Sequence, residues 1–231
     1  MAGRERGRSS RADAAVRAAP STPAQRARPH VVRAYVGLGA NLGDAAGTLA
    51  AGIHALTALP GARLAGISRL YATAPVGVTD QPAFRNAVVA LDVPAGPDPE
   101  TGALALLLAL KMVERAFGRQ VRERWGPREL DLDLLVFGRH AVRVERPPAA
   151  LSEDPAKPAL QWLQVPHASS RERLFVLAPL ADLAPGLRPP GWGETVASAR
   201  GRAEAREGPD AARPVATWDA RRGGWNAGAG D

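Results

Sequence analysis

Cysteine is absent from the 231 residues of this chain. Its absence excludes a disulfide scaffold, a thiolate metal site and a cysteine nucleophile, and it fits a reducing compartment. Long apolar runs are missing as well. The longest, residues 103–110, is far shorter than the roughly 20 residues that a membrane-spanning helix needs. We therefore expect a cytoplasmic protein that does not insert into a membrane.

The first 30 residues lack the apolar core of a secretory signal peptide. They carry seven arginines and two acidic residues, which is a net charge of +5 out of +7 for the whole chain. This composition predicts a disordered N-terminal tail over residues 1–30, with an organelle transit peptide as the alternative. The rest of the chain is nearly balanced in charge despite a pI of about 11.0. We therefore expect no nucleic-acid partner.

Hydrophobic residues make up 45% of the chain and charged residues 23%, which is ordinary usage for a globular protein. The length allows one catalytic domain with extensions. Apolar periodicity and turn residues predict two helices. The first is capped by Asp44 and ends near residue 59, and the second is capped by Asp98 and ends near residue 117. The predicted strands are 31–37, 63–71, 84–93, 131–137 and 140–145. The order β-α-β-β-α-β predicts an α+β, ferredoxin-like fold with helices packed on a mainly antiparallel sheet.

The second half of the chain contains two segments whose order is harder to predict. Four prolines between residues 147 and 164 predict an inserted surface loop without regular structure. Residues 171–183 predict a short helix broken at Pro179. We expect the catalytic domain to span 31–199. Residues 200–231 are expected to be a partly disordered tail, although Trp218 and Trp225 could dock.

Two aspartates one residue apart are the first candidate for chemistry. In a strand, Asp131 and Asp133 leave on the same face, with Cα atoms about 7 Å apart. Carboxylates at this spacing suit hard cations such as Mg²⁺, which takes one or two of them together with phosphate oxygens and water. The alternative for an isolated Asp-x-Asp is the polar face of a half-buried strand.

An arginine-rich loop, residues 118–130, precedes the two aspartates directly. Arginine offers a planar fork of donors that matches phosphate oxygens. Surface loops also carry arginines for solubility alone. Cations beside a carboxylate pair nevertheless predict a site where a polyphosphate and its magnesium bind between them.

Four segments stand in a fixed order along the chain: Tyr35–Gly43 (YVGLGANLG), Tyr71–Asn86 (YATAPVGVTDQPAFRN), Arg124–Leu135 (RWGPRELDLDLL), and a closing part with Val165-Pro166-His167 and Arg173–Leu180. Together they resemble the 6-hydroxymethyldihydropterin pyrophosphokinases over roughly residues 32–190. The resemblance implies transfer of pyrophosphate from ATP to 6-hydroxymethyl-7,8-dihydropterin, which gives the pterin pyrophosphate and AMP in folate biosynthesis. It implies two Mg²⁺ ions and ATP as co-substrate. We expect a monomer.

By matching positions, the resemblance assigns the metal to Asp131 and Asp133, which it counts as catalytic together with Arg119 and Arg128. The implied ATP contacts are Arg119, Arg122, Trp125, Arg128, His167 and Arg173. The implied pterin contacts are Thr73, Ala74, Val76, Phe84, Asn86 and Phe175. Phe84 and Phe175 would stack on the heterocycle, and the Asn86 amide would pair with its polar edge.

Other interpretations of single residues remain at this point. His167 and Trp125 alone would be read as structural, and Glu114 in the second helix is expected to be exposed. A ferredoxin-like RNA-binding module is one rival function, but the expected strands lack the aromatic pattern that stacks bases. An inactive scaffold homologue is the other, and the retained aspartates and arginines argue against it.

Overall fold

The computed structural model describes residues 30–75, 80–118, 128–152 and 157–227. The predicted N-terminal tail and the predicted site residues Val76, Arg119, Arg122 and Trp125 lie outside these ranges, apart from His30. The strands are β1 (Val31–Ala40), β2 (Arg63–Ile67), β3 (Leu70–Thr73), β4 (Phe84–Pro94), β5 (Asp131–Phe137), β6 (Val142–Glu145), β7 (Trp162–Val165), β8 (Arg213–Asp219) and β9 (Gly224–Ala227). The helices are α1 (Ala45–Thr57), α2 (Pro99–Ala116), α3 (Leu174–Leu183) and α4 (Val196–Glu207), with short 3₁₀ turns at Pro148–Ala150 and Pro209–Ala212.

The larger sheet has the order β5-β1-β4-β3-β8-β9, with β2 also paired to β4. All of its paired neighbours run antiparallel. Strand β4 therefore lies between β1 and the β2/β3 strands, as the ferredoxin-like topology requires. The predicted fold class is confirmed.

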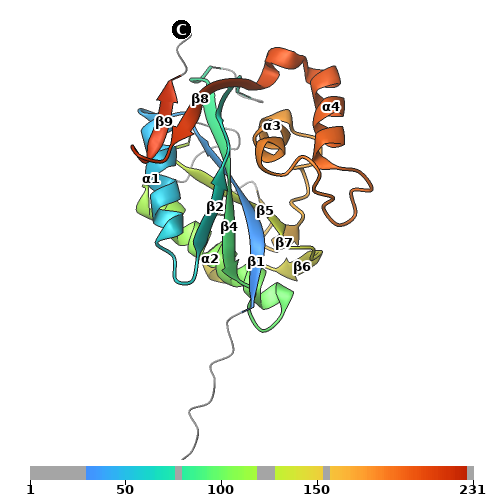
Figure 1. Ribbon diagram of the computed structural model, residues 1–231. Coiled ribbons are helices and arrows are strands. Elements are labelled where there is room, and N and C mark those ends of the chain that lie inside the picture. Colours follow the sequence, from blue (N-terminus) through green and yellow to red (C-terminus); the bar gives the residue numbers. More distant parts are fainter. Residues whose placement is uncertain (1–29, 76–79, 119–127, 153–156, 228–231) are drawn as a thin grey trace, which may run out of the picture.

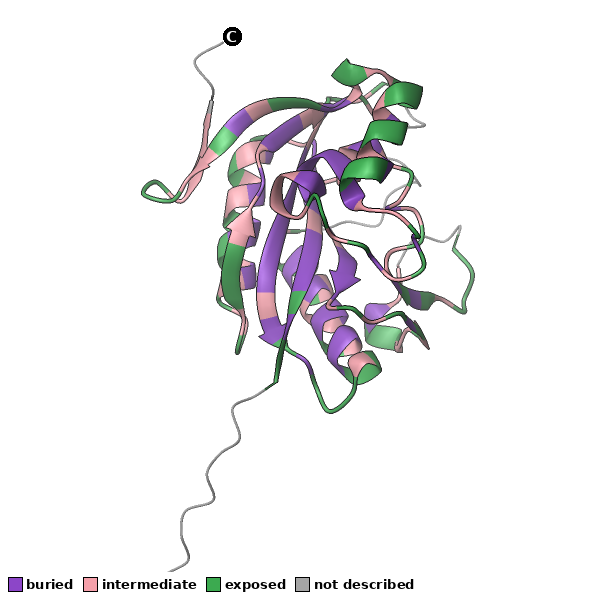
Figure 2. Cartoon of the chain, turned by 45° about the vertical axis from the view of Figure 1, so that its right-hand side comes forward, coloured by how far each residue is buried: buried purple, intermediate pink, exposed green. Residues whose placement is uncertain are grey.

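Helices lie on both faces of the sheet (Figure 1), and the central strands are largely buried (Figure 2). Each face carries its own apolar core. Alternate residues of β1 and β4 pack with α1 and α2 on one face, and the remaining ones with α3 and α4 on the other. A register shift opposite Tyr35 and Val36 leaves Leu135 of β5 as an extra residue, and Leu135 and Val136 both lie in the second core. The bulge thus places two consecutive residues on one face, where regular alternation would place them on opposite faces.

The predicted starts of the first two helices are confirmed. The Asp44 side chain accepts a hydrogen bond from the Gly47 amide at 2.9 Å, and the Asp98 side chain accepts one from the Thr101 amide at 2.8 Å. Each bond satisfies an amide that has no carbonyl partner within its own helix. Pro99 occupies the first turn of α2, where its missing N–H costs nothing.

Three predicted elements differ from the structure. The single strand expected over 63–71 is divided into β2 and β3, because Ser68 between them bonds to Val88 through both its amide and its hydroxyl. The segment 147–164 is not wholly irregular, since β7 begins within it at Trp162 and pairs with β6. Helix α3 continues through Pro179, and its buried neighbours offset the one lost hydrogen bond.

Residues 200–227 contain the rest of α4, a 3₁₀ turn and strands β8 and β9, where composition predicted a partly disordered tail. Ala199 and Ala203 bury one side of α4 in the second core. Strand β8 pairs with β3, and the ring of Trp225 meets that of Trp218 edge to face at 4.9 Å. Composition predicted disorder because small residues pack here without a strong apolar pattern.

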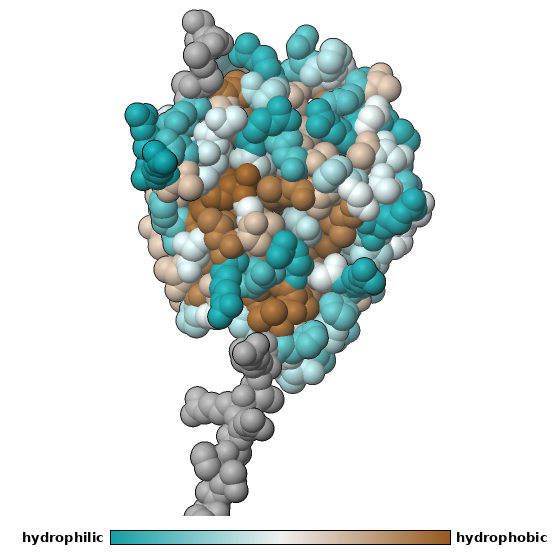
Figure 3. Space-filling model, viewed as in Figure 1, coloured by the Kyte–Doolittle hydropathy of each residue, from teal (hydrophilic) through white to brown (hydrophobic). Residues whose placement is uncertain are grey.

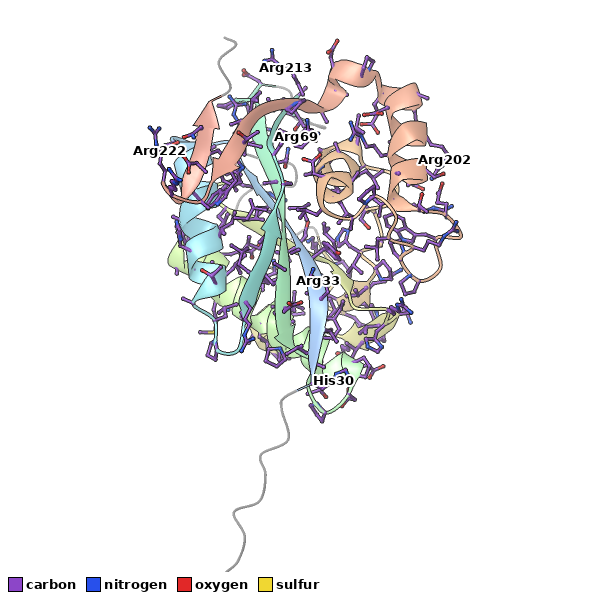
Figure 4. All side chains as sticks on the ribbon, in the orientation of Figure 1. His30, Arg33, Arg69, Arg202, Arg213 and Arg222 are labelled. Carbon is purple, nitrogen blue, oxygen red and sulfur yellow. The ribbon has the colours of Figure 1, made fainter. Side chains whose placement is uncertain are left out.

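The surface seen in Figure 3 has apolar side chains over the middle of the sheet, interrupted by polar ones. Val31 and Leu64 are among the exposed large hydrophobic residues. The arginines labelled in Figure 4 come from different elements and are spread over the molecule. None of the helices in the described ranges has the length and hydropathy that a membrane crossing requires.

Candidate active site

The register of the sheet places two of the predicted site residues on one row. Gly39 of β1 pairs with Asp131 of β5 on one side and with Asn86 of β4 on the other. Asn86 pairs in turn with Tyr71 of β3. Strands lie about 4.8 Å apart, so the Cα atoms of Asp131 and Asn86 are about 10 Å apart. Directly paired residues point to the same face, and Tyr71 identifies it as the face that α3 and α4 cover.

Glycines form the floor between the aspartates and Asn86. Gly37 pairs with Asp133, as Gly39 does with Asp131. A Cβ atom on Gly39 would lie 3.1 Å from the Asn86 Oδ1 atom, and one on Gly37 would lie 3.4 Å from the Leu135 side chain. Side chains at these positions would crowd the space above the strand. The YVGLG segment thus contributes a bare surface to the site.

Asp131 and Asp133 are both half-buried, and Leu132 between them is fully buried in the opposite core. This confirms that the two aspartates share one face of β5. The Arg128 Nη1 atom lies 2.5 Å from the Asp131 Oδ2 atom. The protein therefore holds a guanidinium group against the carboxylate to which the sequence assigns a metal.

The donor set of this region fits a hard divalent cation that shares its coordination with a substrate. Within the described ranges, no cluster of three or more His, Cys, Asp or Glu side chains is arranged to hold a metal ion by itself. Two carboxylates on one strand face leave coordination positions for phosphate oxygens and water, which is how Mg²⁺ is commonly held beside a nucleotide.

Asn41, directly after β1, connects the two loops that flank the site. Its backbone N–H donates to the Arg128 carbonyl at 3.1 Å, and its Oδ1 accepts from the Arg128 amide at 2.8 Å. Its Nδ2 donates to the Gln81 Oε1 at 2.9 Å and to the Pro82 carbonyl at 3.1 Å. Asn41 is 3% exposed. The sequence analysis placed Asn41 in a motif but missed this connection, which only the fold creates.

The described pterin candidates lie at the β3–β4 end of the row. The Asn86 Nδ2 atom donates to the Thr73 Oγ1 atom at 2.8 Å, and both residues are buried. Phe84 pairs with Thr73, and the exposed Ala74 follows it. Phe175 lies in the first turn of α3, which packs on β4. Phe84 thus belongs to the sheet, and Phe175 belongs to the helix that packs on it.

Two candidate phosphate contacts, His167 and Arg173, come from the segment between β7 and α3. The His167 amide donates to the Leu135 carbonyl at 2.9 Å, which fixes this turn to β5. Arg173 precedes α3, with its guanidinium 5.6 Å from the centre of the Phe175 ring. A cavity of about 360 Å³ lies beside His167, and its lining includes neither aspartate. Its position does not mark the site that the aspartates define.

Lys157 is a further cation that the sequence analysis did not assign. Partial desolvation lowers the pKa of its ammonium group, and the positive charges of Arg146, Lys111 and Arg128 lower it further, while Asp133 opposes them. The inserted segment therefore reaches the neighbourhood of the aspartates. The sequence contains no local signal that would predict Lys157 near the aspartates, because the fold alone brings the two segments together.

Known proteins are similar to this chain over its central part. The sequence model of the 7,8-dihydro-6-hydroxymethylpterin-pyrophosphokinase family matches residues 35–185. A Pseudomonas aeruginosa 2-amino-4-hydroxy-6-hydroxymethyldihydropteridine pyrophosphokinase is 42% identical over 160 residues, covering 69% of this chain and 85% of that protein. The protein of the same name from Methylorubrum extorquens is 41% identical over 157 residues, covering 68% of this chain and 85% of that protein.

Among solved structures, a Plasmodium falciparum HPPK-DHPS triple mutant with STZ-DHP matches with a TM-score of 0.62 and 15% identity. The match covers 81% of this chain and 47% of the Plasmodium chain, so this chain spans about half the length of that protein. The likeness supports the fold.

Proposed function

The chain belongs to the 7,8-dihydro-6-hydroxymethylpterin-pyrophosphokinase family, and we propose that it performs the family's reaction on the sheet row between Asp131 and Asn86. The reaction transfers pyrophosphate from ATP to 6-hydroxymethyl-7,8-dihydropterin and yields the pterin pyrophosphate and AMP, as a step of folate biosynthesis. The single observation that supports this location best is the pairing of Gly39 with both Asp131 and Asn86.

In this proposal Asp131 and Asp133 hold two Mg²⁺ ions together with the nucleotide phosphates. Bound magnesium supplies positive charge that stabilises the phosphate oxygens as the bond to the leaving AMP breaks. Arg128 forms an ion pair with Asp131, and in this proposal it would contact phosphate once a cation binds that carboxylate. We assign His167 and Arg173 to the phosphates as well, and Arg119, Arg122 and Trp125 by resemblance to the family.

The pterin takes the other end of the row. The Asn86 Oδ1 and the neighbouring backbone of Thr73, Ala74 and Val76 would bond its polar edge, while Phe84 and Phe175 contact its faces. Asn86 is held by its bond to Thr73 before any ligand binds, so little ordering is required on binding. The hydroxymethyl oxygen would then lie toward the aspartates, within reach of the β-phosphorus.

Catalysis in this account is positioning and charge stabilisation, and we assign no side chain as a general base. The proposal includes a cytoplasmic monomer without a nucleic-acid partner.

The test is AMP formation by the full chain with ATP, Mg²⁺ and the pterin, followed by chromatography. We expect AMP and the pterin pyrophosphate to appear in equal amounts, and neither to appear without the pterin or in EDTA. ADP as the nucleotide product, or AMP formed at the same rate without pterin, would contradict the proposal.

A further inference from the structure

Glu114 is buried in the last turn of α2, where the sequence analysis expected an exposed residue. It is 1% exposed. Its Oε2 atom accepts a hydrogen bond from the Lys111 Nζ atom at 2.7 Å, and the Lys111 side chain is itself only 14% exposed. Its Oε1 atom accepts a bond from the Leu132 amide at 2.7 Å. A carboxylate out of water needs such partners, so its position is closely defined.

The amide that Glu114 accepts from belongs to the residue between Asp131 and Asp133. Strand β5 lies at one end of the larger sheet, and an edge strand has backbone groups without a strand partner. Glu114 satisfies the amide of Leu132, and the His167 amide satisfies the carbonyl of Leu135 farther along β5. Side chain and loop contacts thus take the place of a neighbouring strand.

Leu132 is fixed from two directions. Its side chain is fully buried in the core with α1 and α2, and its amide is held by Glu114. Asp131 and Asp133 are the direct neighbours of Leu132 in the chain. A rotation of the peptide groups around Leu132 would therefore turn their carboxylates away from each other. Ligands for a metal must be held to within about 0.5 Å by their supporting contacts.

We propose that Glu114 is a positioning residue, which sets the distance and direction between the Asp131 and Asp133 carboxylates through the Leu132 amide. The inference rests on the proposed function, in which these carboxylates bind the metal. Glu114 touches no substrate in this account, and Lys111 holds its carboxylate in place through the 2.7 Å hydrogen bond to Oε2. Outer contacts of this kind change metal affinity by about 10- to 100-fold when they are removed.

Three variants distinguish two properties of Glu114, the oxygen that accepts the hydrogen bond from the Leu132 amide and the negative charge of the carboxylate. Glu114→Ala removes both. The double variant Glu114→Gln with Lys111→Met keeps an acceptor for Leu132 in a neutral pair of similar size. The double variant Glu114→Leu with Lys111→Met removes the acceptor and leaves an apolar pair, which replaces a buried ion pair with little loss of stability and serves if Glu114→Ala does not fold.

The first measurement is Mn²⁺ binding to the full chain, by electron paramagnetic resonance, with a non-hydrolysable ATP analogue present. The second is hydrogen exchange of the Leu132 amide. We expect the Ala and Leu/Met variants to bind Mn²⁺ at least about tenfold more weakly and to exchange the Leu132 amide faster. The Gln/Met variant should stay within about threefold of the wild type.

Two outcomes overturn the inference. In one, a folded variant without the acceptor exchanges Leu132 rapidly yet binds Mn²⁺ as the wild type does. In the other, the Gln/Met variant binds as weakly as the Leu/Met variant, which would mean that Glu114 acts by charge. The proposed function fails separately, if Asp131→Asn leaves Mn²⁺ binding unchanged.

Discussion

Asp131 and Asn86 lie on one row of the sheet because each pairs with Gly39, from opposite sides. The row connects the residue assigned to the metal with the residue assigned to the pterin across a single intervening strand. Their separation is thus set by backbone pairing, which is far stiffer than a pair of loops. Substitutions along the row should therefore alter substrate positioning before they alter folding.

Replacing Gly39 with alanine tests the bare floor of the site. The added Cβ would lie 3.1 Å from the Asn86 Oδ1 atom, so Asn86 must shift by a few tenths of an ångström. We expect kcat/KM for the pterin to fall by about tenfold or more, with the KM for ATP nearly unchanged. Gly201→Ala is the matched control, because that position in α4 has no atom within 4 Å of an added Cβ and should be slightly stabilised. Equal kinetics for the two variants would contradict the prediction.

Asn41 should couple the two substrates, because it bonds Arg128 on one side and Gln81 and Pro82 on the other. We expect pterin to bind more tightly in the presence of an ATP analogue and Mg²⁺, and Asn41→Ala to reduce that gain. Asn41→Asp keeps the acceptor for the Arg128 amide and loses the donor to the other loop. Calorimetric titration of pterin with and without the analogue measures the coupling. If the ATP analogue raises pterin affinity in both variants as much as in the wild type, Asn41 does not couple the two substrates.

The C-terminal hairpin should contribute to stability rather than act as a tail. The Trp225 Nε1 atom donates to the Ser68 carbonyl at 3.2 Å, and its ring packs on Trp218. Trp225→Ala should lower the free energy of unfolding by about 2 kcal/mol, since the ring is only partly buried. Trp162→Ala is the control, because Trp162 is 39% exposed and should cost less than about 1 kcal/mol. Urea titration measures both, and equal values would contradict the prediction.

Glu194 should make stability depend on acid pH. Hydrogen bonds from Arg202, Ser198 and Arg171 lower the pKa of its carboxyl from 4.5 to about 2. The unfolded chain therefore takes up the proton first as the pH falls. The contribution of Glu194 is fully present above the ordinary pKa and is lost as the pH approaches 2. The difference in urea midpoint between wild type and Glu194→Gln should be smaller at pH 3 than at pH 6. A constant difference would show that Glu194 is not held in this way.

Much of the fold could be predicted from local signals. The Asp44 and Asp98 side chains cap their helices by accepting a hydrogen bond from the amide three residues later in the chain. Strand β5 has the bounds that the sequence pattern predicts. The same-face placement of Asp131 and Asp133 follows from the period of a strand. These features depend on neighbours in the sequence.

The misses depend on contacts between distant segments. Glu114 is polar and in a helix, so its burial follows only from the position of the Leu132 amide. The strand β8 forms because β3 offers an edge to it, which no local pattern signals. Helix α3 tolerates Pro179 because packing on the sheet compensates for the missing bond. In each case tertiary contacts outweigh local propensity.

The most direct test of the central claim is pyrophosphoryl transfer by Asp131→Asn and Asp133→Asn, measured as pterin-dependent AMP formation at saturating ATP. Asparagine keeps the shape of the side chain and removes the charge that would hold Mg²⁺. Asp92→Asn is the control, because Asp92 is paired with Arg33 elsewhere on the sheet. We predict a fall in turnover of about a thousandfold or more for both site variants, with the fold intact by circular dichroism, and little change for the control. Turnover within about tenfold of wild type in either folded site variant would contradict the assignment of the metal to this pair of aspartates.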